Sequence, residues 1–141
     1  MKPTVFATIS RLGQAASEAI SADARWKWDE RFQAALTVLS TTDAAALYLA
    51  LSEISEDWTS DSVGTCPEPV GYLVDELGGL REGQHLFSAM MSPGSLTYIA
   101  SWPWRDGAHV SVRFGTYDVD PEPTEAALVR LTIMRGMGIE P

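Results

Sequence analysis

The sequence predicts an α+β protein with three N-terminal helices, a short fourth helix, a three-stranded antiparallel meander and a C-terminal helix packed on one sheet face. Two patterns lead to this prediction. Apolar residues recur every three or four positions in the first half of the chain, and they occur at every second position between Ser95 and Val119. A chain of 141 residues, 45% of them hydrophobic, has the size of one ordinary domain, so we expect a single domain over residues 1–141.

The segment from Ser95 to Val119 predicts a β-hairpin. Apolar residues alternate with other residues on both sides of a turn: Leu96, Tyr98, Ala100 and Trp102 before it, and Val110, Val112 and Phe114 after it. In the turn, Pro103 cannot donate a ladder hydrogen bond, and Asp106-Gly107 tolerates the positive φ that tight hairpin turns require. We expect the apolar sides of the two strands to form the face against which the helices pack.

Helical spacing predicts three helices in the first 56 residues. The first covers residues 4–22 and the second covers residues 24–39. The third covers residues 44–56 and follows a cap at Thr41-Thr42-Asp43. The apolar residues on which these helices depend are Val5, Ile9, Leu12 and Ala16 in the first, Trp28, Phe32, Ala35, Leu36 and Leu39 in the second, and Ala44, Leu47, Leu51 and Ile54 in the third.

A loop, a short helix and one more strand are predicted before the hairpin. Residues 59–68 lack periodicity and are rich in turn-forming residues. From Pro69 onward, apolar residues at i, i+3, i+4 and i+7 predict a helix that Gly78-Gly79 ends. The segment from His85 to Met91 then predicts the first strand of the meander.

The last predicted helix follows two prolines that end the sheet. Thr124 or Asp120 is expected to cap it, and Gly136 is expected to stop it. The residues expected to face inward are Leu128, Leu131 and Met134.

The charge distribution bears on the choice of partner. The net charge is −9, and no Lys or Arg occurs between Arg31 and Arg81, whereas acidic residues are frequent there. Such a field repels phosphate backbones, so we expect no nucleic acid as a partner and favour a basic protein or peptide. No apolar stretch approaches the roughly 20 residues of a membrane span, and residues 5–9 are too short for a signal-peptide core. We therefore expect a cytoplasmic protein without a membrane partner.

Motifs of catalysis and metal binding are absent, so we expect binding rather than catalysis and no cofactor. Cys66 lies in an acidic neighbourhood, which raises the pKa of a thiol and so disfavours a nucleophile. His85 and His109 lack the close spacing of metal ligands. Two further patterns fail on spacing: Asp118, Asp120 and Glu122 as a calcium loop, and Gly78, Gly79 and Gly83 as a phosphate loop.

The predicted partner-binding residues fall in two groups. At the hairpin tip, Trp102, Trp104 and Arg105 are of the types enriched at binding hot spots, although Trp102 and Trp104 could instead cover the sheet. The second group comprises acidic residues of the middle third: Glu53, Glu56, Asp57, Asp61, Asp75 and Glu76.

These observations favour a small acidic non-enzymatic protein-binding module that engages a basic partner, of the secretion chaperone, immunity protein or adaptor type. The alternative is a small-molecule-binding or small enzymatic α+β domain with a pocket between sheet and helices, using Tyr98, His109 or Arg113. A third hypothesis is a structural homo-oligomer, of which a homodimer is the simplest form.

Overall fold

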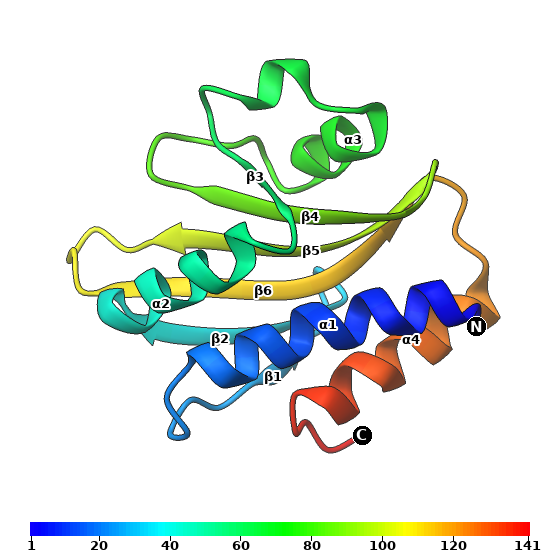
Figure 1. Cartoon of the computed structure of the whole chain (residues 1–141), viewed down its shortest axis with the longest axis horizontal. Coiled ribbons are helices and arrows are strands. Elements are labelled where there is room, and N and C mark those ends of the chain that lie inside the picture. Colours follow the sequence, from blue (N-terminus) through cyan, green and yellow to red (C-terminus); the bar gives the residue numbers. More distant parts are fainter.

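A six-stranded antiparallel sheet forms the centre of the molecule, with strand order β1-β2-β6-β5-β4-β3 (Figure 1). The computed structural model describes every residue from Met1 to Pro141. In chain order the elements are α1 (Pro3–Ala19), β1 (Lys27–Asp29), β2 (Ala34–Ser40), α2 (Thr41–Ser52), β3 (Glu56–Trp58), the 3-10 turn η1 (Val63–Thr65), α3 (Glu68–Glu76), β4 (His85–Ser92), β5 (Ser95–Pro103), β6 (His109–Asp118) and α4 (Pro123–Gly136).

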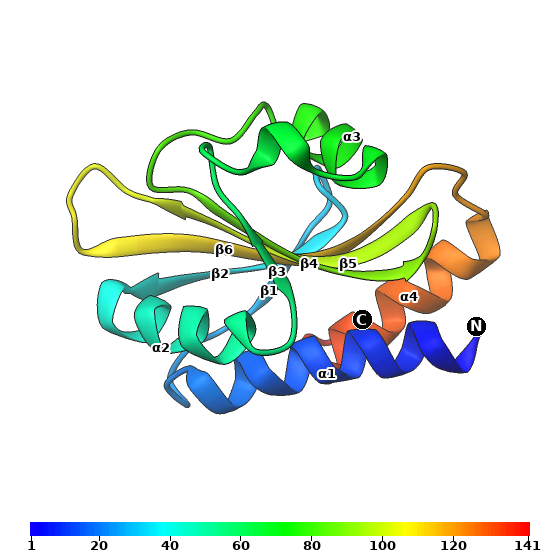
Figure 2. The same ribbon diagram turned by 45° about the horizontal axis from the view of Figure 1, so that its top comes forward.

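Helices cover both faces of this sheet. Helices α1, α2 and α4 pack on one face, here called the three-helix face, and α3 packs on the other, the α3 face (Figure 2). The buried strand residues of the three-helix face are Ala35, Leu39, Phe87, Ile99, Val110, Val112 and Phe114, and those of the α3 face are Leu86, Leu96, Tyr98 and Ala100. Because α3 packs on the β4 and β5 side, the α3 face of β1 and β2 has no helix over it (Figure 1).

Helix α1 is the longest helix and supplies much of the three-helix core. Its first turn contains Pro3, and Ile9, Leu12 and Ala16 are buried, in agreement with the predicted stripe. Gly13 lets the Phe114 ring approach the helix closely, since an added Cβ would lie 3.2 Å from that ring. Neither α1 nor any other helix combines the length and apolar content needed to cross a membrane.

The predicted helix over residues 24–39 is wrong, because these residues form β1 and β2. A tight turn joins the two strands: Asp29 Oδ1 accepts hydrogen bonds from the backbone N–H groups of Arg31 and Phe32, and Gln33 has φ 49°. In β2, the neighbouring β-branched residues Thr37 and Val38 favour a strand. The apolar residues that suggested a 3.6-residue period therefore belong to two short strands and a turn.

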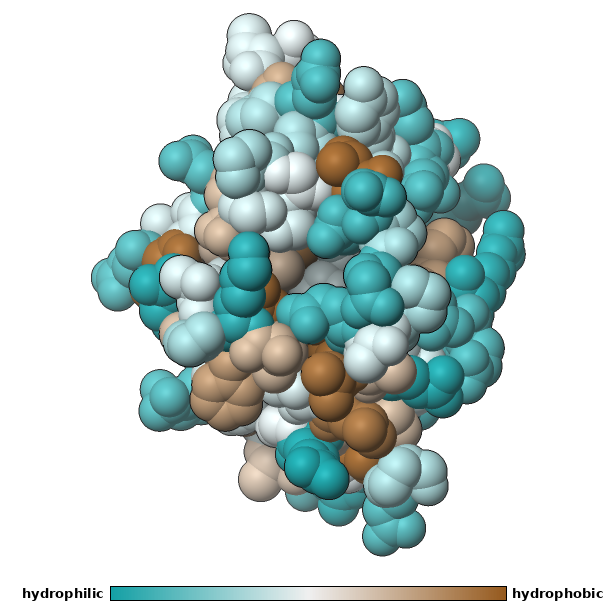
Figure 3. All heavy atoms as spheres, turned by 90° about the vertical axis from the view of Figure 1, so that its right-hand side faces the viewer, coloured by the Kyte–Doolittle hydropathy of each residue, from teal (hydrophilic) through white to brown (hydrophobic).

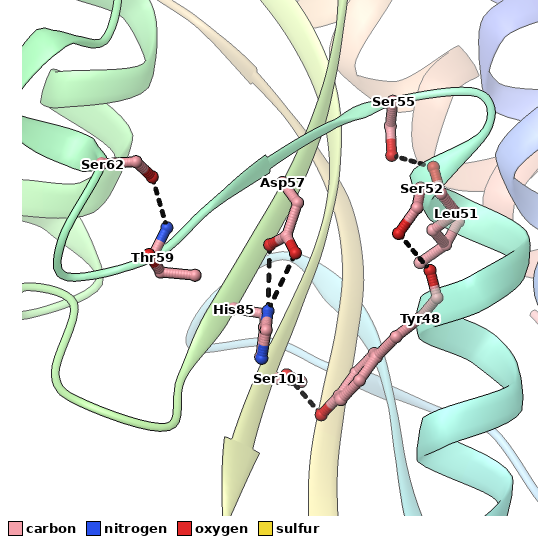
Figure 4. Close-up of polar contacts among 9 residues, drawn as sticks. All are labelled: Tyr48, Leu51, Ser52, Ser55, Asp57, Thr59, Ser62, His85 and Ser101. Atoms are coloured by element: carbon pink, nitrogen blue, oxygen red, sulfur yellow. Dashed lines mark hydrogen bonds and ion pairs between the residues drawn. The ribbon is translucent and has the colours of Figure 1, made fainter.

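The predicted third helix is also too long. Helix α2 ends at Ser52, and the next residues lead into β3, which pairs with β4 from Glu56 opposite Ser88 to Trp58 opposite Leu86. Serine hydroxyls donate hydrogen bonds to backbone carbonyls in the last turn of α2. The Ser52 hydroxyl donates to Tyr48 O and the Ser55 hydroxyl donates to Leu51 O, both at 2.6 Å (Figure 4). The three-stranded meander is thus only the β4–β5–β6 part of a six-stranded sheet. Before the short helix α3, the chain forms two helices, α1 and α2, instead of the predicted three, together with three strands.

The hairpin exists, but its two alternating patterns point to opposite faces. Phe114 lies opposite Ile99 in the β5–β6 register, so Phe114 shares the three-helix face with Ile99. Leu96 and Tyr98 lie on the α3 face instead. The expectation of one shared apolar face is wrong because β5 is buried on both sides from Ser95 to Ser101, where its small polar residues are covered by helices.

Helix α4 is present, but its inward face differs from the predicted one. Leu128 and Leu131 are 41% and 39% exposed, whereas Val129, Ile133, Met134 and Met137 are buried. The cap also differs, because the Glu122 carboxylate accepts from the N–H groups of Thr124 and Glu125. Several apolar residues are adjacent or nearly adjacent in the sequence of this helix. The spacing pattern therefore predicted Leu128 and Leu131 to be buried, whereas Val129 and Ile133 are the buried residues.

The phenol of Tyr98 gives the core a pH dependence. Burial raises the pKa of Tyr98 to about 12 from an ordinary value of 10.0, with Arg113 opposing the rise and Asp29 and Glu76 adding to it. Below pH 10 the phenol is neutral in both states and contributes no slope. As the pH rises from 10 toward 12, only the unfolded chain ionises, so the free energy of unfolding should fall by about 1.4 kcal/mol per unit.

We expect Tyr98→Phe to remove this slope. Urea unfolding of both proteins at pH 9.5, 10.5 and 11.5 measures the difference, which cancels the titration of all other groups. Equal pH dependence in the two proteins would show that the Tyr98 phenol ionises as easily in the folded chain as in the unfolded one.

Candidate functional site

The structure separates the predicted partner-binding residues into three places. Trp102, Trp104 and Arg105 lie at the β5–β6 hairpin, Glu53, Glu56 and Asp57 lie at and before β3, and Asp61, Asp75 and Glu76 lie in the η1 and α3 region. Of these residues, Glu53 and Glu56 line a groove of about 730 Å³. We call it the edge groove, and its remaining lining residues are Arg11, Ser52, Ile54, Ser55, Trp58, Pro67, Val70, Ser88, Ala89 and Met90.

The edge groove runs beside an unpaired stretch of β4. Strand β3 pairs only with Leu86–Ser88, but β4 continues to Ser92. The outer side of residues 89–92 therefore has no strand partner, and the Met90 side chain there is 44% exposed. An unpaired strand edge offers backbone N–H and C=O groups to another extended chain.

The opposite edge of the sheet is less open. Strand β1 pairs with Ala34–Leu36, so the outer side of the rest of β2, opposite its pairing with β6, has no strand partner. There the Thr37 hydroxyl donates to the Arg25 carbonyl at 2.7 Å, which ties the segment before β1 along β2. The contrast makes the β4 edge the better place for an added strand.

Apolar and acidic residues divide the lining of the edge groove between them. The Trp58 indole N–H donates to the Ser88 hydroxyl at 2.9 Å, which fixes the indole between β3 and β4, and Val70 of α3 is buried beside it. Glu53 and Glu56 are exposed and form no ion pair, and Arg11 is the one basic residue in the lining. The groove thus carries negative charge beside apolar surface.

Asp57 points away from this groove and has a structural partner. Its two carboxylate oxygens lie 2.9 and 3.2 Å from His85 Nδ1 (Figure 4). The Tyr48 ring is tilted against the His85 ring at 4.7 Å between centroids, and the Tyr48 hydroxyl donates to the Ser101 hydroxyl at 2.8 Å. Burial raises the pKa of Tyr48, and Ser101 is fully buried. The cluster therefore ties α2, β3, β4 and β5 together.

The hairpin residues lie on and beside the α3 face. Trp104 is 46% exposed, its indole N–H donates to the Ser111 hydroxyl at 2.9 Å, and its ring lies 5.0 Å from the His109 ring. The backbone N–H of Ala108 is the main group that lowers the pKa of Asp106. His109 Nδ1, 2.6 Å from Asp106 Oδ2, lowers this pKa further. Trp104 therefore folds partly back over the hairpin, and Arg105 remains exposed.

The alternative pocket between sheet and helices has a different lining from the one expected. A cavity of about 190 Å³ lies where α4 begins, bordered by Val5, Trp28, Met91, Glu125 and Val129 among others. Figure 3 shows this end of the molecule, with hydrophobic side chains gathered over its lower half. Tyr98, His109 and Arg113 do not line it, and no cluster of three or more His, Cys, Asp or Glu side chains could hold a metal ion. Cys66 is free and partly buried.

Comparison of the chain with protein-family models, with curated proteins and with solved structures finds no match.

Sequence reasoning missed the apolar half of the edge groove. Trp58 lies just beyond the predicted third helix of residues 44–56, and Met90 lies inside the predicted strand from His85 to Met91. Nothing in the local pattern predicts β3 or shows that it covers only three residues. The acidic half, Glu53 and Glu56, was found from charge alone. The turn-forming residues that follow Trp58 were the one local signal that an element ends there.

Proposed function

We propose that this protein is a small non-enzymatic protein-binding module that holds an extended, basic segment of a partner protein in the edge groove. One observation carries the proposal: the unpaired edge of β4 and the unpaired acids Glu53 and Glu56 border the same groove. An unpaired edge suits an extended chain, and the two acids select the sign of its charge.

The proposed binding mode is strand addition. The partner segment lies along residues 89–92 and forms main-chain hydrogen bonds with β4. Alternate side chains of an extended segment point to opposite sides, so one set meets the apolar surface at Trp58 and Met90. Lys or Arg in the segment lies within reach of Glu53 and Glu56 at the rim.

Charge and apolar contact have different tasks in this mode. An exposed ion pair contributes only about 0.2–1 kcal/mol, so the rim acids set partner choice and association rate more than affinity. Affinity comes from main-chain hydrogen bonds and from burial at Trp58 and Met90.

A displayed library of random 12-residue peptides tests the proposal. Selection on the wild-type protein should enrich Lys or Arg alternating with apolar residues. We expect the double variant Glu53→Lys/Glu56→Lys to bind the selected peptides at least about tenfold more weakly, which corresponds to about 1.4 kcal/mol. Raising the salt concentration from 50 to 500 mM should reduce the wild-type affinity in the same direction.

The matched control is Asp23→Lys/Glu140→Lys, which changes the net charge equally at two exposed positions outside the groove. This control should keep most of the wild-type affinity. If it weakens binding as much as the groove variant, net charge rather than the groove attracts the peptides, and the proposed site is wrong.

A further inference from the structure

The part of the α3 face that no helix covers carries a second group of surface residues. It lies toward the β1 edge of the sheet, whereas the edge groove lies at the β4 edge. The β1–β2 turn and strands β2, β5 and β6 supply these residues, here called the arginine patch: Phe32, Leu36, Val38, Trp102 and Arg113. Val38 is 43% exposed, and the other four are partly buried. No residue of this patch lines the edge groove, which lies at the other edge of the sheet.

Arg113 lies at the centre of the patch in a fixed position. Its guanidinium carbon is 4.5 Å from the centroid of the Phe32 ring and 5.3 Å from that of the Trp102 ring. The side chain is only 20% exposed, so two aromatic rings hold the planar guanidinium in place. Such a held guanidinium loses little further freedom when it binds an acceptor.

The hydrogen-bonding capacity of Arg113 is unused. Its Nε lies 3.5 Å from Asp29 Oδ2, which is an ion-pair contact but too long for a good hydrogen bond, and that buried Nε has no partner. No hydrogen bond joins its terminal nitrogens to another protein group, and these nitrogens reach solvent, unlike the buried Nε. A guanidinium offers five N–H donors, so the terminal N–H groups of Arg113 are open to an acceptor from outside the chain.

The local charge has the opposite sign to that of the whole molecule. Lys27 and Arg31 are exposed near Arg113 and form no ion pair, and Asp29 is the one acid in contact with Arg113. On a chain of net charge −9, this is a basic surface. It is therefore complementary to an acidic group, whereas the edge groove is complementary to a basic one.

We infer that the arginine patch binds a protein segment that presents an Asp or Glu side chain next to apolar or aromatic residues. The carboxylate accepts two hydrogen bonds from the Arg113 guanidinium, and the neighbouring apolar residues of the segment cover Leu36 and Val38. The patch has the composition of a binding hot spot, an arginine with aromatic residues in a partly desolvated setting. The net charge opposes a nucleic-acid partner.

The test uses a displayed library of random 12-residue peptides, selected on wild-type protein and counter-selected on Arg113→Met. We expect clones with Asp or Glu beside aromatic or aliphatic residues. Their affinity should fall at least tenfold in Arg113→Lys, which keeps the charge but loses the planar pair of donors. Glu53→Lys/Glu56→Lys should leave their affinity unchanged or increase it, so this result is separate from the outcome for the edge groove.

A two-dimensional amide NMR spectrum of Arg113→Lys verifies the fold, and shifts that differ from wild type only near β1, β2 and β6 make the affinity comparison valid. Should Arg113→Lys fail this check, Val38→Glu provides the second variant. A carboxylate at that exposed position should repel the acidic peptides and lower their affinity at least tenfold. Clones without acidic residues, or clones indifferent to both variants, would overturn the inference. Self-association of the free protein that Val38→Glu abolishes would overturn it in favour of a second copy.

Discussion

Phe114→Ala should lower the free energy of unfolding by about 3–5 kcal/mol, the largest loss expected for a single substitution in this chain. Phe114 is 1% exposed, lies on β6 at the centre of the three-helix face, and packs against α1 at Gly13. Removing the ring leaves a cavity between sheet and helices that rigid strands on either side cannot close. A domain of this size is stabilised by only about 5–15 kcal/mol, so the loss is a large fraction of the total.

Urea unfolding with constant slope measures this loss, and Leu131→Ala is the matched control. Leu131 was expected to face the core from spacing alone, but it is 39% exposed on α4. Its removal should cost about 1 kcal/mol or less, because little apolar surface is uncovered. If Leu131→Ala destabilises the protein as much as Phe114→Ala, the helix has the predicted orientation and the described packing of α4 is incorrect.

Gly115→Ala should cost about 1–3 kcal/mol, although it adds a single methyl group. An added Cβ would lie 2.9 Å from the Tyr98 hydroxyl and 3.1 Å from the Ala34 Cβ. Tyr98 is 2% exposed, so its ring has no free space into which it can move. The strand conformation itself suits alanine, which leaves steric overlap as the cause of the loss.

Gly64→Ala is the control for this substitution. Its added Cβ would meet nothing within 4 Å, and its backbone does not have positive φ. The change should therefore leave the midpoint of thermal unfolding the same or raise it slightly, since alanine reduces the freedom of the unfolded chain. If Gly115→Ala also left the midpoint of thermal unfolding unchanged, the Tyr98 side chain would not lie against Gly115.

Local signals in the sequence predicted elements whose ends are marked by turn chemistry. The short helix α3 begins beside Pro69 and ends before Gly78 and Gly79, which both have positive φ. The β5–β6 turn also matches its prediction, because Asp106 accepts from the N–H groups of Ala108 and His109 and Gly107 has φ 70°. In both places, residues next to one another in the chain determine the structure.

Tertiary packing decided the elements that the sequence did not predict correctly. Over residues 24–39 the same apolar residues fit a helix or two short strands, and pairing of β2 with β6, remote in sequence, selects the strands. In β5, Thr97 and Ser101 are buried on the three-helix face, whereas Leu96 and Tyr98 are buried under α3 on the other face. Neither contact can be read from a window of neighbouring residues.

The candidate site divides in the same way. Charge along the chain was enough to find Glu53 and Glu56, because exposed acids need no tertiary context. The unpaired β4 edge and the arginine patch depend on strand order, which places β3 at one edge and β1 at the other. Arg113 was considered only as part of an internal pocket, since its position between Phe32 and Trp102 joins residues from distant parts of the chain.

NMR titration measures where a bound basic segment lies on the protein. Isotope-labelled protein with assigned amide signals is titrated with a basic peptide selected from the displayed library. The proposal predicts the largest shift changes at the amides of residues 89–92 and at the indole N–H of Trp58, together with slower amide exchange along that edge. Largest changes on the outer side of α3, near Asp75 and Glu76, with residues 89–92 unmoved, would contradict it.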